Sequence, residues 1–172
     1  MRNVIIILLI LFASTVQASQ VDKRLDVLFE QLRASPNRVE AKLVENRIQT
    51  IWMGNEQEDV NLLMRLGNIA IQLRDFPVAY QIFNLVVQKA PHFAEGWNMR
   101  AITFYVMQDF EASLQDTLKS ISLEPRHFRA LFRLGNIYLK IGQHEKAIEA
   151  FRKITAIHPH FELTKGFHSS SI

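Results

Sequence analysis

Histidines are the residues in this 172-residue chain whose chemistry first suggests a metal site, because six of them are present. His158 and His160 form the tightest pair, with Pro159 between them. A zinc site needs three or four ligands at suitable spacing, and the sequence places no third ligand near this pair. A proline flanked by polar residues is typical of a turn. We therefore expect turn residues here, and no metal or other cofactor.

The sequence offers no set of residues that could carry out catalysis. The chain contains no cysteine, and it has neither a G-x-S-x-G motif nor a glycine-rich phosphate loop. Three acids lie close together at Glu56, Glu58 and Asp59. Acidic residues favour the N-terminus of a helix, which explains this group without catalysis. Because no nucleophile and base can be paired, we expect that the protein is not an enzyme.

Cations at helical spacing offer a different kind of chemistry. Arg129, Arg133 and Lys140 follow one another at i, i+4 and i+11, which aligns them as a basic stripe on one helix. Arginine binds carboxylates through two parallel hydrogen bonds. The stripe is compatible with a peptide's C-terminal carboxylate, with an acidic or amphipathic segment of a partner protein, or with a merely solvated face. Nucleic acid is not expected, since 20 basic residues exceed 17 acidic ones by only three.

The N-terminus reads as an export signal over residues 1–18. Arg2 precedes an apolar run from Val4 to Phe12, and small residues lead to Ala18. The run is shorter than the roughly 20 apolar residues that span a bilayer, so we expect cleavage rather than an uncleaved anchor. This predicts a periplasmic protein that meets the membrane only transiently. Without cysteine it carries neither disulfides nor a lipidated cysteine.

A repeat governs the rest of the chain. Pro91, Pro125 and Pro159 stand 34 residues apart and divide the sequence into three blocks, 60–93, 94–127 and 128–161. Small residues recur at the same step, as do apolar ones. Each block predicts two antiparallel helices, with small residues such as Gly67 and Ala79 where the helices approach most closely. Leu63, Leu66 and Ala70 would form the inner apolar stripe of the first block.

These columns resemble the tetratricopeptide repeat (TPR) family, whose signature is W-x₂-L-G-x₂-Y, then A-x₃-F, then P. The third block matches it with Leu131, Leu134, Gly135, Tyr138, Ala147, Phe151 and Pro159. The first block has Ala70 in the tyrosine place, and the second departs at Arg100, Ser113, Thr117 and Ser120. The resemblance implies an all-α, right-handed α-solenoid of helical hairpins. Segments such as "LDVLFEQLR" and "AEGWNMRA" also resemble exported TPR proteins of alphaproteobacteria.

Two segments lie outside the repeats. Residues 22–54 predict another helical hairpin, which we expect to stack on the first repeat as an atypical terminal unit. The tail 162–172 is too short for a capping helix. This leaves the outer face of the third repeat uncovered, which indicates either dimerisation or a truncated chain.

The resemblance implies that the first helices of successive repeats line a concave groove. We expect a protein-interaction adaptor or scaffold that holds a peptide or partner helix there. The family's carboxylate clamp falls by register on Met64, Asn68, Met99, Arg129 and Arg133, with two methionines in place of polar residues. The expected groove residues are Met64, Asn68, Asn98, Met99, Tyr105, Arg129, Phe132, Arg133, Asn136 and Lys140. The alternative is a self-assembling structural module that uses the uncovered C-terminal face.

Overall fold

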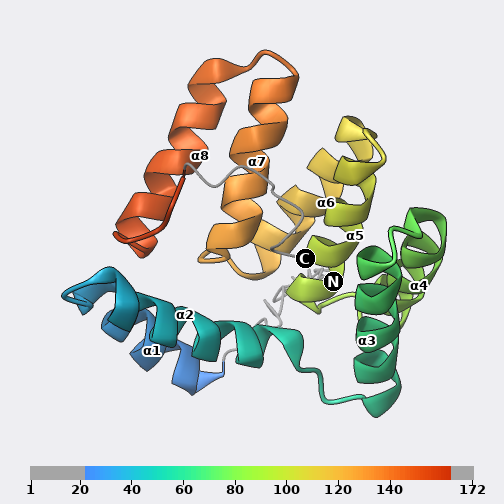
Figure 1. The fold of residues 1–172 in the computed structure, drawn as a ribbon, viewed down its shortest axis with the longest axis horizontal. Helices are drawn as coiled ribbons and strands as arrows, with labels where there is room; N and C mark the ends of the chain where they lie inside the picture. Colours follow the sequence, from blue (N-terminus) through green and yellow to red (C-terminus); the bar gives the residue numbers. More distant parts are fainter. Residues whose placement is uncertain (1–21, 164–172) are drawn as a thin grey trace, which may run out of the picture.

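The computed structural model describes residues 22–163, and all regular structure in that range is helical (Figure 1). Within this described range, eight helices form four antiparallel pairs: α1 (Lys23–Ala34) with α2 (Arg38–Met53), α3 (Glu58–Gln72) with α4 (Phe76–Lys89), α5 (Ala94–Val106) with α6 (Phe110–Leu123), and α7 (Phe128–Lys140) with α8 (His144–Ile157). The predicted all-α array of helical hairpins is confirmed. The predicted export signal 1–18 and most of the tail 162–172 lie outside the described residues. Within 22–163 no helix has both the length and the apolarity needed to cross a membrane.

The turn inside each repeat is built in one way. The second residue after the first helix adopts a left-handed backbone conformation, with φ of 59° at Arg74, 64° at Gln108 and 76° at Gly142. These three residues are spaced 34 apart. Asp75 and Asp109 then cap the second helices, since their side chains accept hydrogen bonds from the amides of the third following residues. Local turn chemistry therefore fixes the hairpins at the repeat period.

Small residues let the two helices of a repeat approach each other, as the sequence predicted. A Cβ atom on Gly67 would lie 2.6 Å from the ring of Phe83, which is fully buried. In the second repeat, Ser113 of α6 donates a hydrogen bond of 2.8 Å to the carbonyl of Ala101 on α5. The close approach of these helices is what selects small residues at these positions.

Polar pairing replaces part of the apolar packing in the second repeat, where the sequence departs from the family signature. The guanidinium of Arg100 makes hydrogen bonds of 2.7 and 2.8 Å to the carboxylate of Asp116. It also donates to Asn84 of the preceding repeat, at 2.7 Å. The ion pair links α5 to α6 and the hydrogen bond to Asn84 links α5 to α4, so the second repeat packs despite its weak match.

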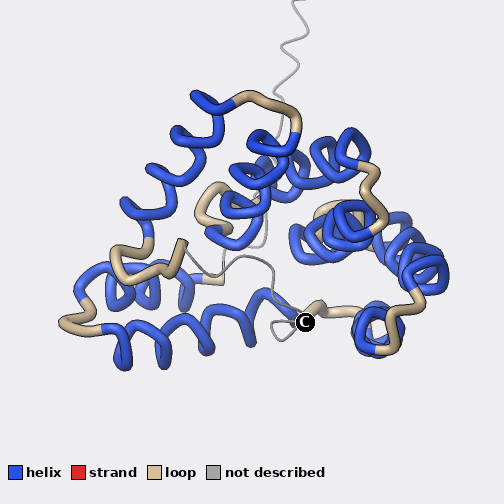
Figure 2. The backbone as a smooth tube through the Cα atoms, turned by 45° about the horizontal axis from the view of Figure 1, so that its top comes forward, coloured by secondary structure: helices blue, strands red, loops and turns tan. Residues whose placement is uncertain are grey.

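The N-terminal hairpin does not stack on the first repeat, and that prediction is wrong. A linker at residues 54–57 separates α2 from α3, and the hairpin turns back beneath the later repeats (Figures 1 and 2). Helix α1 lies against α8, and α2 lies against α5. One apolar core joins the hairpin to the third repeat, and its members include Leu28, Phe29, Ile48, Trp52, Phe128, Leu131 and Ile154.

This arrangement changes which end of the array is covered. Ile154 on α8 is fully buried and belongs to the core shared with the hairpin, so the third repeat is not left bare as predicted. At the other end, Leu66 of α3 is 43% exposed, although the repeat pattern placed it in the inner stripe. Its counterpart Leu134 in the third repeat is 8% exposed. The hairpin covers the end of the last repeat instead of the start of the first.

Candidate functional site

The predicted groove residues fall into a buried and an accessible group. Five of the ten are buried and do not face outward as expected: Met64, Asn98, Met99, Phe132 and Arg133. The two methionines belong to the core of the first two repeats, together with Phe83 and Phe93. Phe132 belongs to the core that includes the N-terminal hairpin. These three apolar residues stabilise the fold and are not available for a partner.

Arg133 is a structural cation rather than a surface one. Its guanidinium is buried, contacts the side-chain oxygen of Asn98, and donates to the Asn98 carbonyl at 3.3 Å. Burial lowers the pKa of Arg133 to about 10, and the nearby charge of Glu95 opposes that shift. The side chain therefore stays charged at neutral pH and joins α7 to α5. The predicted basic stripe is broken at this position.

Arg129 is half-buried, and a carboxylate of the same chain already binds it. Its Nη2 donates a hydrogen bond of 3.0 Å to Oε1 of Glu45, on α2. The same oxygen accepts from Lys42 at 2.9 Å and from Gln49 at 2.7 Å, and the other oxygen lies 3.5 Å from Nε2 of His158. The arginine that the family resemblance assigns to a peptide carboxylate is thus bound by the N-terminal hairpin. No motif in the sequence singled out Glu45.

Buried polar groups extend this contact toward the second repeat. Trp52 of α2 stacks on His127, with ring centroids 4.2 Å apart and planes 19° from parallel. His127 is fully buried, and its Nε2 lies 2.8 Å from Oε2 of Glu95. Glu95 also accepts from Asn98 at 3.1 Å. The hairpin therefore docks through a polar network as well as through its apolar core.

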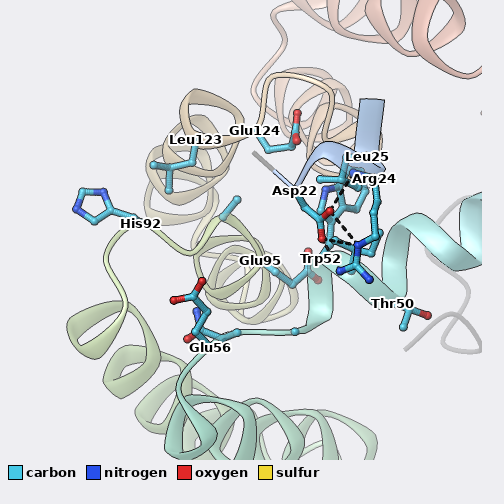
Figure 3. A pocket seen from close by; sticks show the side chains of 14 residues that line it. Asp22, Arg24, Leu25, Thr50, Trp52, Glu56, His92, Glu95, Leu123 and Glu124 are labelled. Carbon is cyan, nitrogen blue, oxygen red and sulfur yellow. Dashed lines mark hydrogen bonds and ion pairs between the residues drawn. The ribbon is translucent and has the colours of Figure 1, made fainter. Parts of the chain in front are cut away.

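A cleft of about 550 Å³ opens where the hairpin meets the turn between α4 and α5 (Figure 3). Trp52 and Leu123 line it together with several acids. Most of these acids already have partners in the chain: Asp22 pairs with Arg24, Glu95 with His127, and Glu124 with Arg126. The predicted histidine pair lies elsewhere, with His158 beside Glu45 and Nε2 of His160 at 2.8 Å from the Ser35 carbonyl oxygen. Among residues 22–163 no group of three histidines or acids is placed to hold a metal ion.

The accessible part of the predicted groove lies toward the C-terminal ends of the first helices. Asn68 on α3 and Asn136 on α7 occupy the same repeat position, and both are half-buried. The side-chain NH₂ of each donates a hydrogen bond of 2.9 Å to the carbonyl four residues earlier. This contact fixes both amides in the same orientation and leaves their oxygens with capacity to accept hydrogen bonds. Half-buried Tyr105 on α5 and exposed Lys140 on α7 complete this accessible group.

Comparison with known proteins agrees with this architecture. The sequence profile of the tetratricopeptide repeat family matches residues 128–161, the span of the third predicted repeat. A TPR repeat-containing protein of Rhizobium etli is 30% identical over 142 residues, which are 83% of this chain and 70% of that protein. Protein bimA of Emericella nidulans is 26% identical over 121 residues, and the aligned part is only 15% of its length. The crystal structure of MamA superimposes with a TM-score of 0.57 at 21% identity, over 76% of this chain and 74% of the MamA chain.

The chain belongs to the tetratricopeptide repeat family. Proteins of this family generally mediate protein–protein interactions, and their fold is typical of non-enzymatic interaction modules. At 21% identity, the likeness to MamA shows a shared fold and nothing more specific.

Proposed function

We propose that this protein is an adaptor that holds a segment of a partner protein in the accessible half of its concave groove. We define this half by Asn68, Tyr105, Asn136 and Lys140. The observation that carries the proposal is the matched geometry of the two asparagines, which are held alike by their own helices. Side chains fixed in advance lose little conformational entropy when they bind.

The chemistry of this group favours an extended peptide segment with at least one acidic residue. Each asparagine oxygen is suited to accept a hydrogen bond from a peptide N–H. Tyr105 offers an aromatic surface beside Phe110, whose ring centroid is 5.4 Å from its own. Lys140 is exposed and supplies a positive charge at the end of α7. Arg129 has no part in this interaction as long as Glu45 occupies it.

The proposed place of action is the periplasm. The arrangement of Arg2, the apolar run and Ala18 supports export, and cleavage after Ala18 would make Ser19 the new N-terminus. Mass spectrometry of protein recovered from the native cell envelope tests this point. A chain that still begins at Met1 would contradict it.

Crosslinking in intact cells followed by affinity capture tests the groove. The double variant Asn68→Ala and Asn136→Ala should recover the principal partner at least about tenfold less than the wild type, because both amide acceptors are lost. A matched control replaces two exposed amides on α4, Gln81→Ala and Gln88→Ala. Equal recovery by the wild type and the groove variant would refute the proposal, as would an equal loss in the control. Circular dichroism should give the same helicity for all three proteins.

A further inference from the structure

Helix α3 carries an exposed apolar stripe that the groove does not use. Leu62 is 49% exposed, Leu66 43%, Ile69 49% and Leu73 74%. The four residues follow one another at steps of four, three and four, which is the spacing of a two-helix packing seam. Exposed leucines are ordinary one by one, but a continuous row along a helix marks an interaction surface.

The repeat period identifies what normally covers this face. The residues 34 positions after Leu62 and Ile69 are Gly96 and Thr103, and both are buried. A Cβ atom on Gly96 would lie 2.6 Å from Val86, on the second helix of the preceding repeat. The next counterparts, Ala130 and Ile137, are fully buried as well. Leu62 and Ile69 therefore lie on the face that accepts a preceding helix in the second and third repeats, whereas Met107 and Ile141, the counterparts of Leu73, are 46% and 40% exposed.

The chain's own preceding helix is engaged elsewhere. By the same register, Ile48 and Trp52 of α2 correspond to Ile82 and Val86 of α4 and would be the residues to cover α3. Instead both are buried in the core shared with the third repeat. Helix α3 consequently lies at the edge of the molecule, without a preceding helix to cover its exposed apolar face (Figure 1).

We infer that the α3 face, defined by Leu62, Leu66, Ile69 and Leu73, binds the same face of a second copy of this chain. Stacking of one copy's α8 on the other copy's α3 would need a free apolar face on α8. Ile154, the α8 counterpart of Val86, is already covered by the N-terminal hairpin. Apart from Ile148, the exposed side chains along α8 are polar or small. The stripe on α3 is thus best matched by itself, in a closed two-fold dimer.

An antiparallel arrangement satisfies the stripe. A two-fold axis between Gly67 and Asn68 sets Leu62 opposite Leu73 of the partner subunit and Leu66 opposite Ile69 of the partner subunit. Arg65 and Gln72 flank this seam on one side and are both exposed, so like charges do not face each other directly. A 15-residue helix is about 22 Å long, so the seam is short. We therefore expect a dissociation constant on the order of 10 µM rather than an obligate dimer.

Analytical ultracentrifugation of protein purified after expression of the full chain tests the dimer. Over about 1 to 500 µM the wild type should pass from monomer to dimer. Leu66→Glu should raise the dissociation constant by at least about tenfold, because it places two carboxylates in the seam. The matched control Ile148→Glu changes an exposed apolar residue on α8 and should dimerise like the wild type. A wild type that stays monomeric, or a dimer lost in Ile148→Glu but kept in Leu66→Glu, would overturn the inference.

Engineered cysteines test the orientation, and the absence of native cysteine makes the readout clean. The double variant Leu62→Cys and Leu73→Cys should oxidise to a covalent dimer. A link within one chain is excluded because 11 residues of helix separate the two sites by about 16 Å. The single variant Leu62→Cys should remain unlinked. Covalent dimer in the single variant, or none in the double variant, would contradict the antiparallel pairing.

Discussion

Glu45 and Arg129 are 84 residues apart in the sequence, yet their side chains form an ion pair of 3.0 Å. The carboxylate comes from the N-terminal hairpin and the guanidinium from the first helix of the last repeat. Glu45 thus occupies the place beside Arg129 that a peptide's C-terminal carboxylate would take in the clamp implied by the family resemblance. The contact joins the N-terminal hairpin to the third repeat.

The first prediction concerns acid. Burial alone would raise the pKa of Glu45, but hydrogen bonds from His158, Lys42 and Arg129 outweigh it and lower the pKa from 4.5 to about 2. A pKa that is lower in the folded state stabilises the fold above pH 4.5, and this contribution is lost as the pH falls from 4.5 to 2. We expect Glu45→Gln to lower the free energy of unfolding by about 2 kcal/mol at pH 7, and by much less near pH 3.

Urea denaturation at several pH values measures this difference. The control Glu30→Gln removes an exposed carboxylate on α1 and should change the free energy of unfolding by less than about 0.5 kcal/mol at every pH. A constant difference between the wild type and Glu45→Gln from pH 7 to pH 3 would show that the carboxylate contributes no pH-dependent stability.

The second prediction concerns Arg133. Replacing it by glutamate would bury a carboxylate near Glu95, so we expect Arg133→Glu to cost about 3 kcal/mol or more of stability. Arg133→Met keeps an unbranched chain without the charge and should cost less. Thermal melts monitored by circular dichroism compare the two. A double charge reversal at Arg129 and Arg133 is therefore unsuitable as a test of partner binding, because it perturbs the fold itself.

The third prediction concerns helix contact. Gly67→Ala would push a methyl group against the fully buried ring of Phe83, so we expect a loss of about 1–3 kcal/mol. Gly54→Ala is the control, because its nearest new contact is 3.6 Å and it lies in the linker after α2. Equal melting temperatures for the two variants would mean that α3 and α4 have room to separate.

The fourth prediction concerns docking of the hairpin. Trp52 contacts the rings of Phe29, His127 and Phe128. Trp52→Ala should cost about 3–5 kcal/mol and release the hairpin from the third repeat. Hydrogen exchange should then show lost protection in α1 and α2, with α3 and α4 retaining theirs. Uniform loss across all helices would show instead that the hairpin and the repeats unfold as one unit.

The sequence predicted the helices well because their signals are local or periodic. Asp75, Gly67 and Phe83 act within one hairpin. Asp75 recurs 34 residues later as Asp109, and Gly67 and Phe83 recur 68 residues later as Gly135 and Phe151. The position of the N-terminal hairpin was predicted wrongly, because no local or periodic signal specifies it. Its apolar residues show that it must be covered, but Trp52 has equally suitable apolar surface on α3 and on the third repeat. The choice depends on contacts such as Trp52 with His127, which no local pattern records.

The groove prediction was wrong for the positions that neighbouring repeats bury. Register alone places Met99 and Arg133 in one column with Arg65, and this column is exposed only on α3. Neighbouring repeats bury it on α5 and α7. Asn68 and Asn136 lie nearer the C-terminal ends of α3 and α7, and both remain half-buried rather than buried. Whether a position is accessible depends on which helices pack over it, and the repeat pattern does not specify those helices.

Docking of the hairpin on the last repeat also sets an order of events during folding. Residues 22–53 precede the repeats in the chain, but Phe128 and Ile154, which they cover, belong to the third repeat. The first two repeats can pack as they appear, since their helices contact their immediate neighbours along the chain. Ile48 and Trp52 can reach their native contacts only once α7 and α8 are present. The N-terminal hairpin is thus among the last described segments to reach its native contacts, although it precedes the repeats in the chain.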